Sequence, residues 1–471
     1  MPTWQGAQPG RLFITLAVGA LIWALPPPVT VAPQAWHLLA IFVATIVGII
    51  VRPLPMGAVA MLGIAATVVT GTLRIGEALS GFANSTVWLI ATAFFISRGF
   101  IKTGLGRRAA YTFMALFGKR TMGLGYSLVA ADLVLAPVTP SNTARAGGVV
   151  FPILQSVAIT AFGPADNPRA RQTGAFLTLV AYQGTVITSA MFITAMAANP
   201  LAVELARQQN IAITWGTWAI AALAPGVVSL VLVPLLIYRL CPPGIRESPD
   251  AQVVARAELA RMGPMQRAEG ILLGILVVLL TLWIFGPMIG VDATAAALAG
   301  LGLLLLSGVL VWDDVCREHE AWNTLVWFAS LVMMATFLGQ LGFIGWFSKE
   351  VGGAIGETGW VTGFLVLSLV YFYSHYLFAS NTAHVSAMFA PFLTVAVSLG
   401  TPPLLAALVL GFFSNLFASL THYATGPSPI FFGSGYVSLG TWWMVGAVVS
   451  VVNIVIWLGV GGMWWKLLGL W

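Results

Sequence analysis

The chain has 471 residues, of which 59% are hydrophobic and only 8% are charged. Soluble domains carry about 25% charged residues, so this composition excludes an ordinary soluble protein and predicts a membrane protein. The net charge of +6 does not indicate nucleic-acid binding, because the basic residues cluster at the ends of apolar runs, as in the positive-inside pattern. Cys241 and Cys316 form no metal-ligand pattern, so no cofactor and no metal centre are expected.

Apolar runs recur from Leu12 to the C-terminus. The first is expected to be a retained helix and not a signal peptide, because no cleavage-site pattern precedes it. Four early spans are predicted at 12–25, 35–52, 56–73 and 87–100. Basic and apolar side chains alternate over 98–120, which is typical of a helix in the membrane interface, with an ordinary cytoplasmic loop as the alternative.

Two short runs follow, and Pro137 and Pro140 lie between them. Because proline prevents one continuous helix, the runs 122–137 and 144–160 predict a hairpin that enters and leaves the membrane on one side. The mixed run 173–200 has many small and hydroxylated residues and predicts a helix interrupted at mid-depth. A span near 214–238 and a hydrophilic cytoplasmic linker come next.

The second half repeats this order. Its predicted elements are spans near 270–288, 292–311 and 324–344, an amphipathic piece at 345–356, a hairpin at 360–399 and a last span at 442–465. Before that last span, Gly426, Pro427 and Pro429 predict another interrupted helix. The predicted division is 1–120, 121–240, the linker 241–268, 269–356 and 357–471.

The sequence Ser-Asn-Thr-Ala occurs at the tip of each predicted hairpin, at 141–144 and 380–383. Each copy has a proline eleven residues after its serine, Pro152 and Pro391. Matched order, motif and spacing predict an inverted repeat, which is a transporter architecture with its site between the repeats. A channel is the alternative within the membrane class, whereas no hydrophilic catalytic cluster points to a membrane enzyme.

Each tip offers the N-terminus of a helix, where free N–H groups and the positive dipole end favour an anion. Two facing tips could therefore hold the two carboxylates of one small dianion. The hydroxyl and amide groups of the motif are its expected contacts, namely Ser141, Asn142, Thr143, Ser380, Asn381 and Thr382. The alternative is that these residues only cap a buried helix end.

Arg145 and His384 occupy the same place in the two copies, four residues after each serine. Fixed positive charge there could replace a bound co-ion, and a carrier of that kind would act as an obligate exchanger. The alternative is that Arg145 pairs with Asp132, the one acidic residue well inside an apolar run. One such acid is a thin basis for proton coupling.

At these motifs the sequence resembles the divalent anion/sodium symporter family, and Pro140–Gly148 and Thr421–Pro427 resemble its branch of 2-oxoglutarate/malate translocators and citrate/succinate antiporters. The resemblance covers essentially the whole chain. It implies an all-α fold of about eleven membrane spans and two re-entrant hairpins, an elevator mechanism, a homodimer, and a bacterial inner-membrane location. The implied activity is exchange of di- and tricarboxylates such as succinate, malate, 2-oxoglutarate and citrate.

The resemblance also implies further site residues. Thr425 and Ser189, with the adjacent Thr188, are added to the substrate contacts. Sodium-coupled symport of dicarboxylates is the alternative activity, and its sodium sites would use Ser141, Asn142, Asn381 and Ala424. The glycine pair usual in sodium-coupled members is replaced here by Ile187-Thr188-Ser189, which favours exchange.

Overall fold

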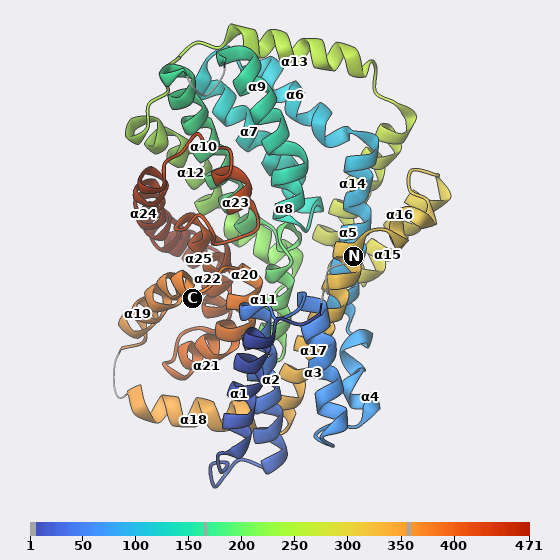
Figure 1. The fold of residues 1–471 in the computed structure, drawn as a ribbon, viewed down its shortest axis with the longest axis vertical. Coiled ribbons are helices and arrows are strands. Elements are labelled where there is room, and N and C mark those ends of the chain that lie inside the picture. Colours follow the sequence, from blue (N-terminus) through green and yellow to red (C-terminus); the bar gives the residue numbers. More distant parts are fainter. Residues whose placement is uncertain (1–5, 164–166, 356–358) are drawn as a thin grey trace. The chain divides into compact units, whose positions relative to one another are not determined.

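The computed structural model describes residues 6–163, 167–355 and 359–471, and within these ranges the chain is helical and contains no strand (Figure 1). Nine of the described helices are long and apolar enough to cross a membrane, and four more are apolar but shorter. The predicted all-α polytopic membrane fold is confirmed. The five-segment division of the chain stays a prediction.

The chain forms two compact units, and neither unit is a continuous stretch of sequence. Unit 1 combines Met1–Ala91, Pro200–Ile213 and His319–Gly411, and unit 2 combines Thr92–Asn199, Thr214–Glu318 and Phe412–Trp471. Each unit therefore joins segments from both halves of the sequence. The two are described separately below.

Unit 1 contains the first membrane helices and the second hairpin (Figure 1). Its helices are α1 Pro9–Ala24, α2 Pro33–Val51, α3 Met56–Val69, α4 Ile75–Ala78, η1 Ser80–Ala83, α17 His319–Gln340, α18 Phe343–Ile355, α19 Trp360–Tyr373, η6 Ser374–Leu377, α20 Asn381–His384, the π-helix η7 Val385–Phe389 and α21 Ala390–Ser398. Helix α18 corresponds to the predicted piece 345–356, whose last residue lies outside the described ranges.

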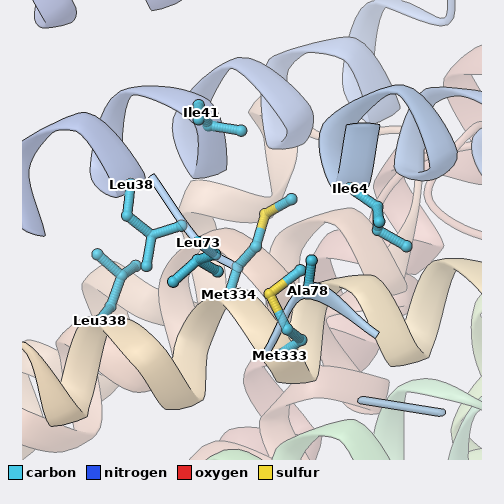
Figure 2. Close-up of a cluster of buried hydrophobic side chains, with 8 residues drawn as sticks. All are labelled: Leu38, Ile41, Ile64, Leu73, Ala78, Met333, Met334 and Leu338. Atoms are coloured by element: carbon cyan, nitrogen blue, oxygen red, sulfur yellow. The ribbon is translucent and has the colours of Figure 1, made fainter. Parts of the chain in front are cut away.

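The core of unit 1 joins helices that are some 270 residues apart in sequence (Figure 2). It consists of Leu38, Ile41, Ile64, Leu73, Ala78, Met333, Met334 and Leu338. Lipid tails are as apolar as these side chains, so the cluster stabilises the unit by close packing. Gly63 permits that packing, because a Cβ there would lie 2.8 Å from the Met334 methyl group.

Unit 2 contains the first hairpin and the C-terminal helices. Its helices are α6 Leu105–Phe117, α7 Thr121–Leu135, η2 Ala136–Val138, α8 Asn142–Arg145, the π-helix η3 Ala146–Val150, α9 Phe151–Phe162, α10 Pro168–Met191, η4 Ile193–Ala195, α12 Trp215–Leu240, α13 Pro249–Met262, α14 Arg267–Phe285, η5 Gly286–Ile289, α15 Ala293–Leu306, α16 Trp312–Cys316, η8 Phe417–Ser419, α23 Pro427–Phe432, α24 Leu439–Val455, the π-helix η9 Ile456–Val460 and α25 Gly461–Leu467. Three further helices hold residues of both units, α5 Ser85–Thr103, α11 Ala198–Arg207 and α22 Pro403–Leu416.

Helix α10 is the centre of unit 2, because every residue from Phe176 to Met191 is buried. It therefore has no lipid-facing side over its last four turns. This explains its mixed sequence, since its hydroxyl and amide groups can be hydrogen-bonded by neighbouring protein, whereas lipid offers no partner.

The predicted linker 241–268 is not a free connection. It contains α13, which packs on α6 and α9 within unit 2 (Figure 1). Arg108 of α6 also donates hydrogen bonds within unit 2, to Glu269 Oε1 at 2.7 Å and to the carbonyl oxygen of Gly263 at 2.9 Å. The location of α6 in a membrane interface stays a prediction.

Candidate functional site

The first predicted hairpin is present, with its turn at the motif. Helix α7 and the short η2 form the entering limb, and α8, η3 and α9 form the returning limb. Pro152 is the second residue of α9, directly after the five-residue π-helix. Proline has no N–H and its ring clashes with the carbonyl of an α-helical turn, so the wider π turn accommodates it.

The second hairpin, in unit 1, has the same order of elements. Helix α19 and η6 enter, and α20, the π-helix η7 and α21 return. From the first helical residue to the start of α9 or α21, each boundary lies at the same distance from the motif serine in both hairpins, and Pro391 again follows the π-helix. The internal repeat predicted from the motif and its proline is therefore visible in the backbone.

The two motif serines cap their helices. Ser141 Oγ accepts a hydrogen bond from the Ala144 N–H at 3.0 Å, and Ser380 Oγ accepts one from the Ala383 N–H at 3.4 Å. This is the standard N-cap contact, worth about 1 kcal/mol. Both serines thus make the capping contacts that the alternative interpretation of the motif expects. Each cap also fixes the direction in which the first N–H groups of its helix point.

The first tip lies against the turn that follows α22. Asn142 is 9% exposed, and its Nδ2 donates to Thr425 Oγ1 at 3.3 Å. The same amide lies 3.5 Å from the sulfur of Met196, in the interruption after α10. Thr143, the exposed member of the motif, contacts Gly426. The structure therefore brings together three of the predicted site residues, Asn142, Thr143 and Thr425, and their contact with a substrate stays a prediction.

Gly426→Ala is expected to lower the free energy of unfolding by about 1–3 kcal/mol, because a Cβ there would overlap the hydroxyl of Thr143. The backbone at Gly426 is right-handed helical, so alanine adds no backbone strain. The change is measured as thermal stability of the purified protein in detergent. Thr143→Ala should restore most of the loss. Gly148→Ala is the control, since nothing lies within 4 Å of its added Cβ, and equal losses in both variants would contradict the prediction.

Arg145 forms a fully buried ion pair with Asp132. The Arg145 Nε lies 2.8 Å from Asp132 Oδ1, and both side chains are at most 1% exposed. Thr188 Oγ1 donates a short hydrogen bond to the other carboxylate oxygen. The pairing of Arg145 with Asp132 is therefore present, and the role of Arg145 in place of a bound co-ion stays a prediction.

The guanidinium of Arg145 is surrounded by oxygen atoms. Besides Asp132, its nitrogens donate to the carbonyl oxygens of Thr139 and Ala195 at 3.1 and 3.0 Å, and to the hydroxyls of Thr188 and Ser189 at 3.5 and 2.9 Å. These five bonds match the five donors of the group. Arg145 therefore links α7, the tip, α10 and the segment after α10, and Thr188 and Ser189 belong to this network.

The predicted interruption of the run 173–200 is present, but it falls later than the hydroxyl-rich stretch 184–189. Helix α10 continues to Met191, the backbone is extended at Phe192, and α11 begins at Ala198. The freed carbonyl groups find partners, since Asn199 Nδ2 donates to the carbonyl oxygens of Ser189 and Phe192 at 2.8 and 2.9 Å. Asn415 then donates to Asn199 Oδ1 at 2.7 Å.

The second interruption lies between η8 and α23. Pro427 and Pro429 fall in the first turn of α23, where proline is tolerated. They therefore mark the start of α23, and they also prevent the preceding helix from continuing through the turn. The hydroxyl of Tyr182 donates to the Ala418 carbonyl and lies 2.7 Å from Ser428 Oγ. Gln183 Nε2 donates to the Ser419 carbonyl at 3.1 Å.

Four of these supporting residues were not in the predicted site: Asn199, Asn415, Tyr182 and Gln183. Their signal in the sequence is the one that identified the motif, a polar side chain inside an apolar run. They meet a need that every helix break in a membrane creates, because each freed backbone group requires a hydrogen-bond partner.

The second tip, described within unit 1, is built differently around its titratable residue. Asn381 and His384 are 4% and 0% exposed. The His384 Nε2 lies 2.9 Å from Ser374 Oγ, and the rings of Tyr371, Phe378 and His375 stand edge-on to it. Thr382 is half-buried, and its carbonyl accepts from Ser386 at 2.7 Å. Because the tips belong to different units, the meeting of Asn142 and Asn381 stays a prediction.

Among the described residues, no group of three or more histidine, cysteine, aspartate or glutamate side chains could hold a metal ion. Cys241 and Cys316 are both free.

The fold is shared with solved membrane transporters. The YdaH transporter of Alcanivorax borkumensis aligns with a TM-score of 0.53 at 15% identity, covering 98% of this chain and 96% of that one. MtrF of Neisseria gonorrhoeae, described as an antimetabolite efflux pump, aligns at 0.54 with 13% identity, over 96% and 97%.

The chain belongs to the family described as the sodium:sulfate symporter transmembrane region, whose model matches residues 7–471. YflS of Bacillus subtilis, provisionally named a malate transporter, is 54% identical over 98% of this chain and 96% of its own. Dicarboxylate transporter 1 of spinach chloroplasts is 51% identical, over 99% and 83%. The Escherichia coli inner membrane protein YbhI is 37% identical, over 97% of each. Paired hairpins and interrupted helices on this fold, together with the transporter family and the named transporters that the sequence matches, define a polytopic membrane transporter and not an enzyme.

Proposed function

We propose that this protein transports small dicarboxylates by one-for-one exchange. Two full-length relatives named for malate and dicarboxylate transport support the substrate class. The observation that carries the exchange mechanism is the oxygen cage around Arg145.

A carboxylate, two carbonyls and two hydroxyls are the ligands that a hard cation takes from a protein. Here the guanidinium of Arg145 fills that cage permanently. Because this cation is part of the protein, it cannot be released on the other side of the membrane. Transport therefore cannot be coupled to a gradient of that cation. Its charge is balanced by Asp132, so the tip is held in place without a co-ion. The empty carrier then has no gradient to drive its return, and it resets by carrying a second dicarboxylate back.

In this proposal the substrate is a dianion such as succinate or malate, with 2-oxoglutarate and citrate as further candidates. Its carboxylates bind the first N–H groups of the two capped helices and the amides of Asn142 and Asn381, with Thr143, Thr382 and Thr425 as hydroxyl donors. Arg145, Thr188 and Ser189 position the first tip, and His384 does so for the second. The resemblance to the family supports elevator-type movement, a homodimer and a location in a bacterial inner membrane.

Sodium-coupled symport is the second candidate, favoured by the description of the matching family. In that case Asn381 and Ala424 would contribute a sodium site.

The test is uptake of labelled succinate or malate into vesicles that contain the purified protein. Vesicles are preloaded with unlabelled dicarboxylate or left empty, and each set is measured with and without a sodium gradient. We expect uptake only into preloaded vesicles, with no dependence on sodium. Sodium-driven uptake into empty vesicles would establish symport instead, and uptake that neither saturates nor responds to preloading would indicate a channel.

A further inference from the structure

Helices α1, α2 and α3 of unit 1 enclose an apolar groove of about 360 Å³. Its α1 wall consists of Leu12, Thr15, Leu16, Gly19, Ala20 and Trp23. These positions recur every three or four residues and so form one stripe along the helix. The neighbouring face of α1 carries exposed Phe13 and Leu21, at 72% and 65%, as expected of a helix that faces lipid.

A second, polar pocket of about 520 Å³ lies at the start of the same stripe. Gln8 and Arg11 of the α1 side and Arg52 at the end of α2 line it, and Pro53 lines both the pocket and the groove. Arg11 Nη1 lies 3.5 Å from the Arg52 carbonyl oxygen, so the two arginines are neighbours. Neither has a carboxylate partner among the residues that the structure describes.

Two further observations make this pocket favourable for an anion. Both α1 and α3 begin beside it, and neither N-cap residue, Gln8 or Pro55, caps its helix with a side chain. The uncapped N–H groups and the positive dipole end of α1 therefore add to the charge of the two arginines. At the start of α3 the Gly57 N–H is bonded to Asn323 Oδ1 at 3.1 Å, and the negative end of α2 at Arg52 offsets part of the dipole contribution. Arg52 also adopts a left-handed backbone, with φ of +54°, which a non-glycine residue occupies at some cost.

The geometry points to a binding site for an anionic phospholipid, with the phosphate in the pocket and one acyl chain in the groove. The stripe from Leu12 to Trp23 extends about 17 Å along α1 at 1.5 Å per residue. One leaflet of the hydrocarbon core is about 15 Å deep, half of about 30 Å. A chain that enters at Arg11 thus fills the groove within a single leaflet. A free anion would leave the groove empty, and a zwitterionic lipid such as phosphatidylcholine would place its own cation beside the two arginines.

The experiment measures lipid retained by the full-length protein in detergent, using native mass spectrometry with phosphatidylglycerol or phosphatidylcholine added. The wild type should retain phosphatidylglycerol about tenfold more than phosphatidylcholine. The double variant Arg11→Gln, Arg52→Asn should lose that preference, and asparagine tolerates the left-handed backbone at position 52. Ala20→Trp, which fills the groove at an exposed position, should lose both lipids. Arg74→Gln, an exposed arginine beyond the opposite end of α3, is the control and should behave as the wild type.

Equal retention of the two lipids by the wild type, or an unchanged preference in the double variant, would overturn the proposal. Thermal protection by glycerol phosphate or inorganic phosphate alone, as strong as that by the lipid, would assign the pocket to a free anion. A change of oligomeric state in Ala20→Trp would assign the groove to a second copy of the chain.

Discussion

Asp132→Asn is expected to lower the free energy of unfolding by about 3–5 kcal/mol, because it leaves the Arg145 guanidinium buried without its counter-charge. The five bonds of Arg145 hold four parts of unit 2 together, so transport should be lost as well. Thermal unfolding in detergent and vesicle uptake measure the two effects.

The control for this prediction removes both charges. A buried ion pair can often be replaced by apolar groups of similar volume at little cost in stability. The double variant Asp132→Leu, Arg145→Met removes the uncompensated charge but leaves the carbonyls of Thr139 and Ala195 without a donor. Its stability should therefore lie between that of Asp132→Asn and that of the wild type, and transport should remain impaired because the tip loses these hydrogen bonds. If Asp132→Asn alone is as stable as the wild type, the pair does not hold the tip.

Asn142→Ala is expected to raise the KM for succinate by about tenfold to a hundredfold, with a smaller effect on kcat. A hydrogen bond to a charged group contributes about 1.5–3 kcal/mol, and the Asn142 amide is the proposed donor to one substrate carboxylate. Asn381→Ala should have a similar effect through the second tip. The readout is the concentration dependence of exchange into preloaded vesicles.

Two comparisons make this prediction specific. Thr425→Val removes the acceptor of the Asn142 amide, so its effect and that of Asn142→Ala should not add in the double variant. Asn453→Ala changes another buried asparagine of unit 2 whose amide has no hydrogen-bond partner among the described residues, and its KM should be unchanged. Equal KM values for Asn142→Ala and Asn453→Ala would contradict a substrate role for Asn142.

The hairpins could be predicted because proline and the capping motif act locally. Pro137 and Pro140 interrupt the helix just before the turn, and a serine before Asn-Thr is a strong helix start. Pro152, by contrast, is accommodated within the helical returning limb next to the π turn. The spans could be predicted for a similar reason, since length and hydropathy decide whether a helix crosses a membrane. Thr425 was assigned to the site only through the resemblance, and its contact with Asn142 was not predicted.

Features that depend on distant partners could not be predicted in this way. The interruption of the run 173–200 could be predicted, but its position after Met191 could not, because there is no proline or glycine at Phe192. The break is stabilised there by Asn199 and Arg145, which supply partners for its carbonyl groups. The sequence left two roles open for Arg145, and only the fold brings Asp132 to it. Likewise, nothing local indicates that α17 would pack against both α2 and α3, because close packing of side chains such as Met334 depends on the shape of their neighbours.

The π-helices of the two hairpins have a consequence for how chains of this family are compared. A π turn holds one residue more than the α turn it replaces, so residues 146–150 and 385–389 each carry a surplus residue relative to an unbroken α-helix. Deleting one residue there would restore α-helical phase and leave the outer part of α9 or α21 in its present rotation. The same deletion elsewhere in the limb would turn every later side chain by about 100°. Single-residue gaps between relatives belong in these two windows, and an alignment that puts them elsewhere misassigns the lipid-facing and buried sides of the limb.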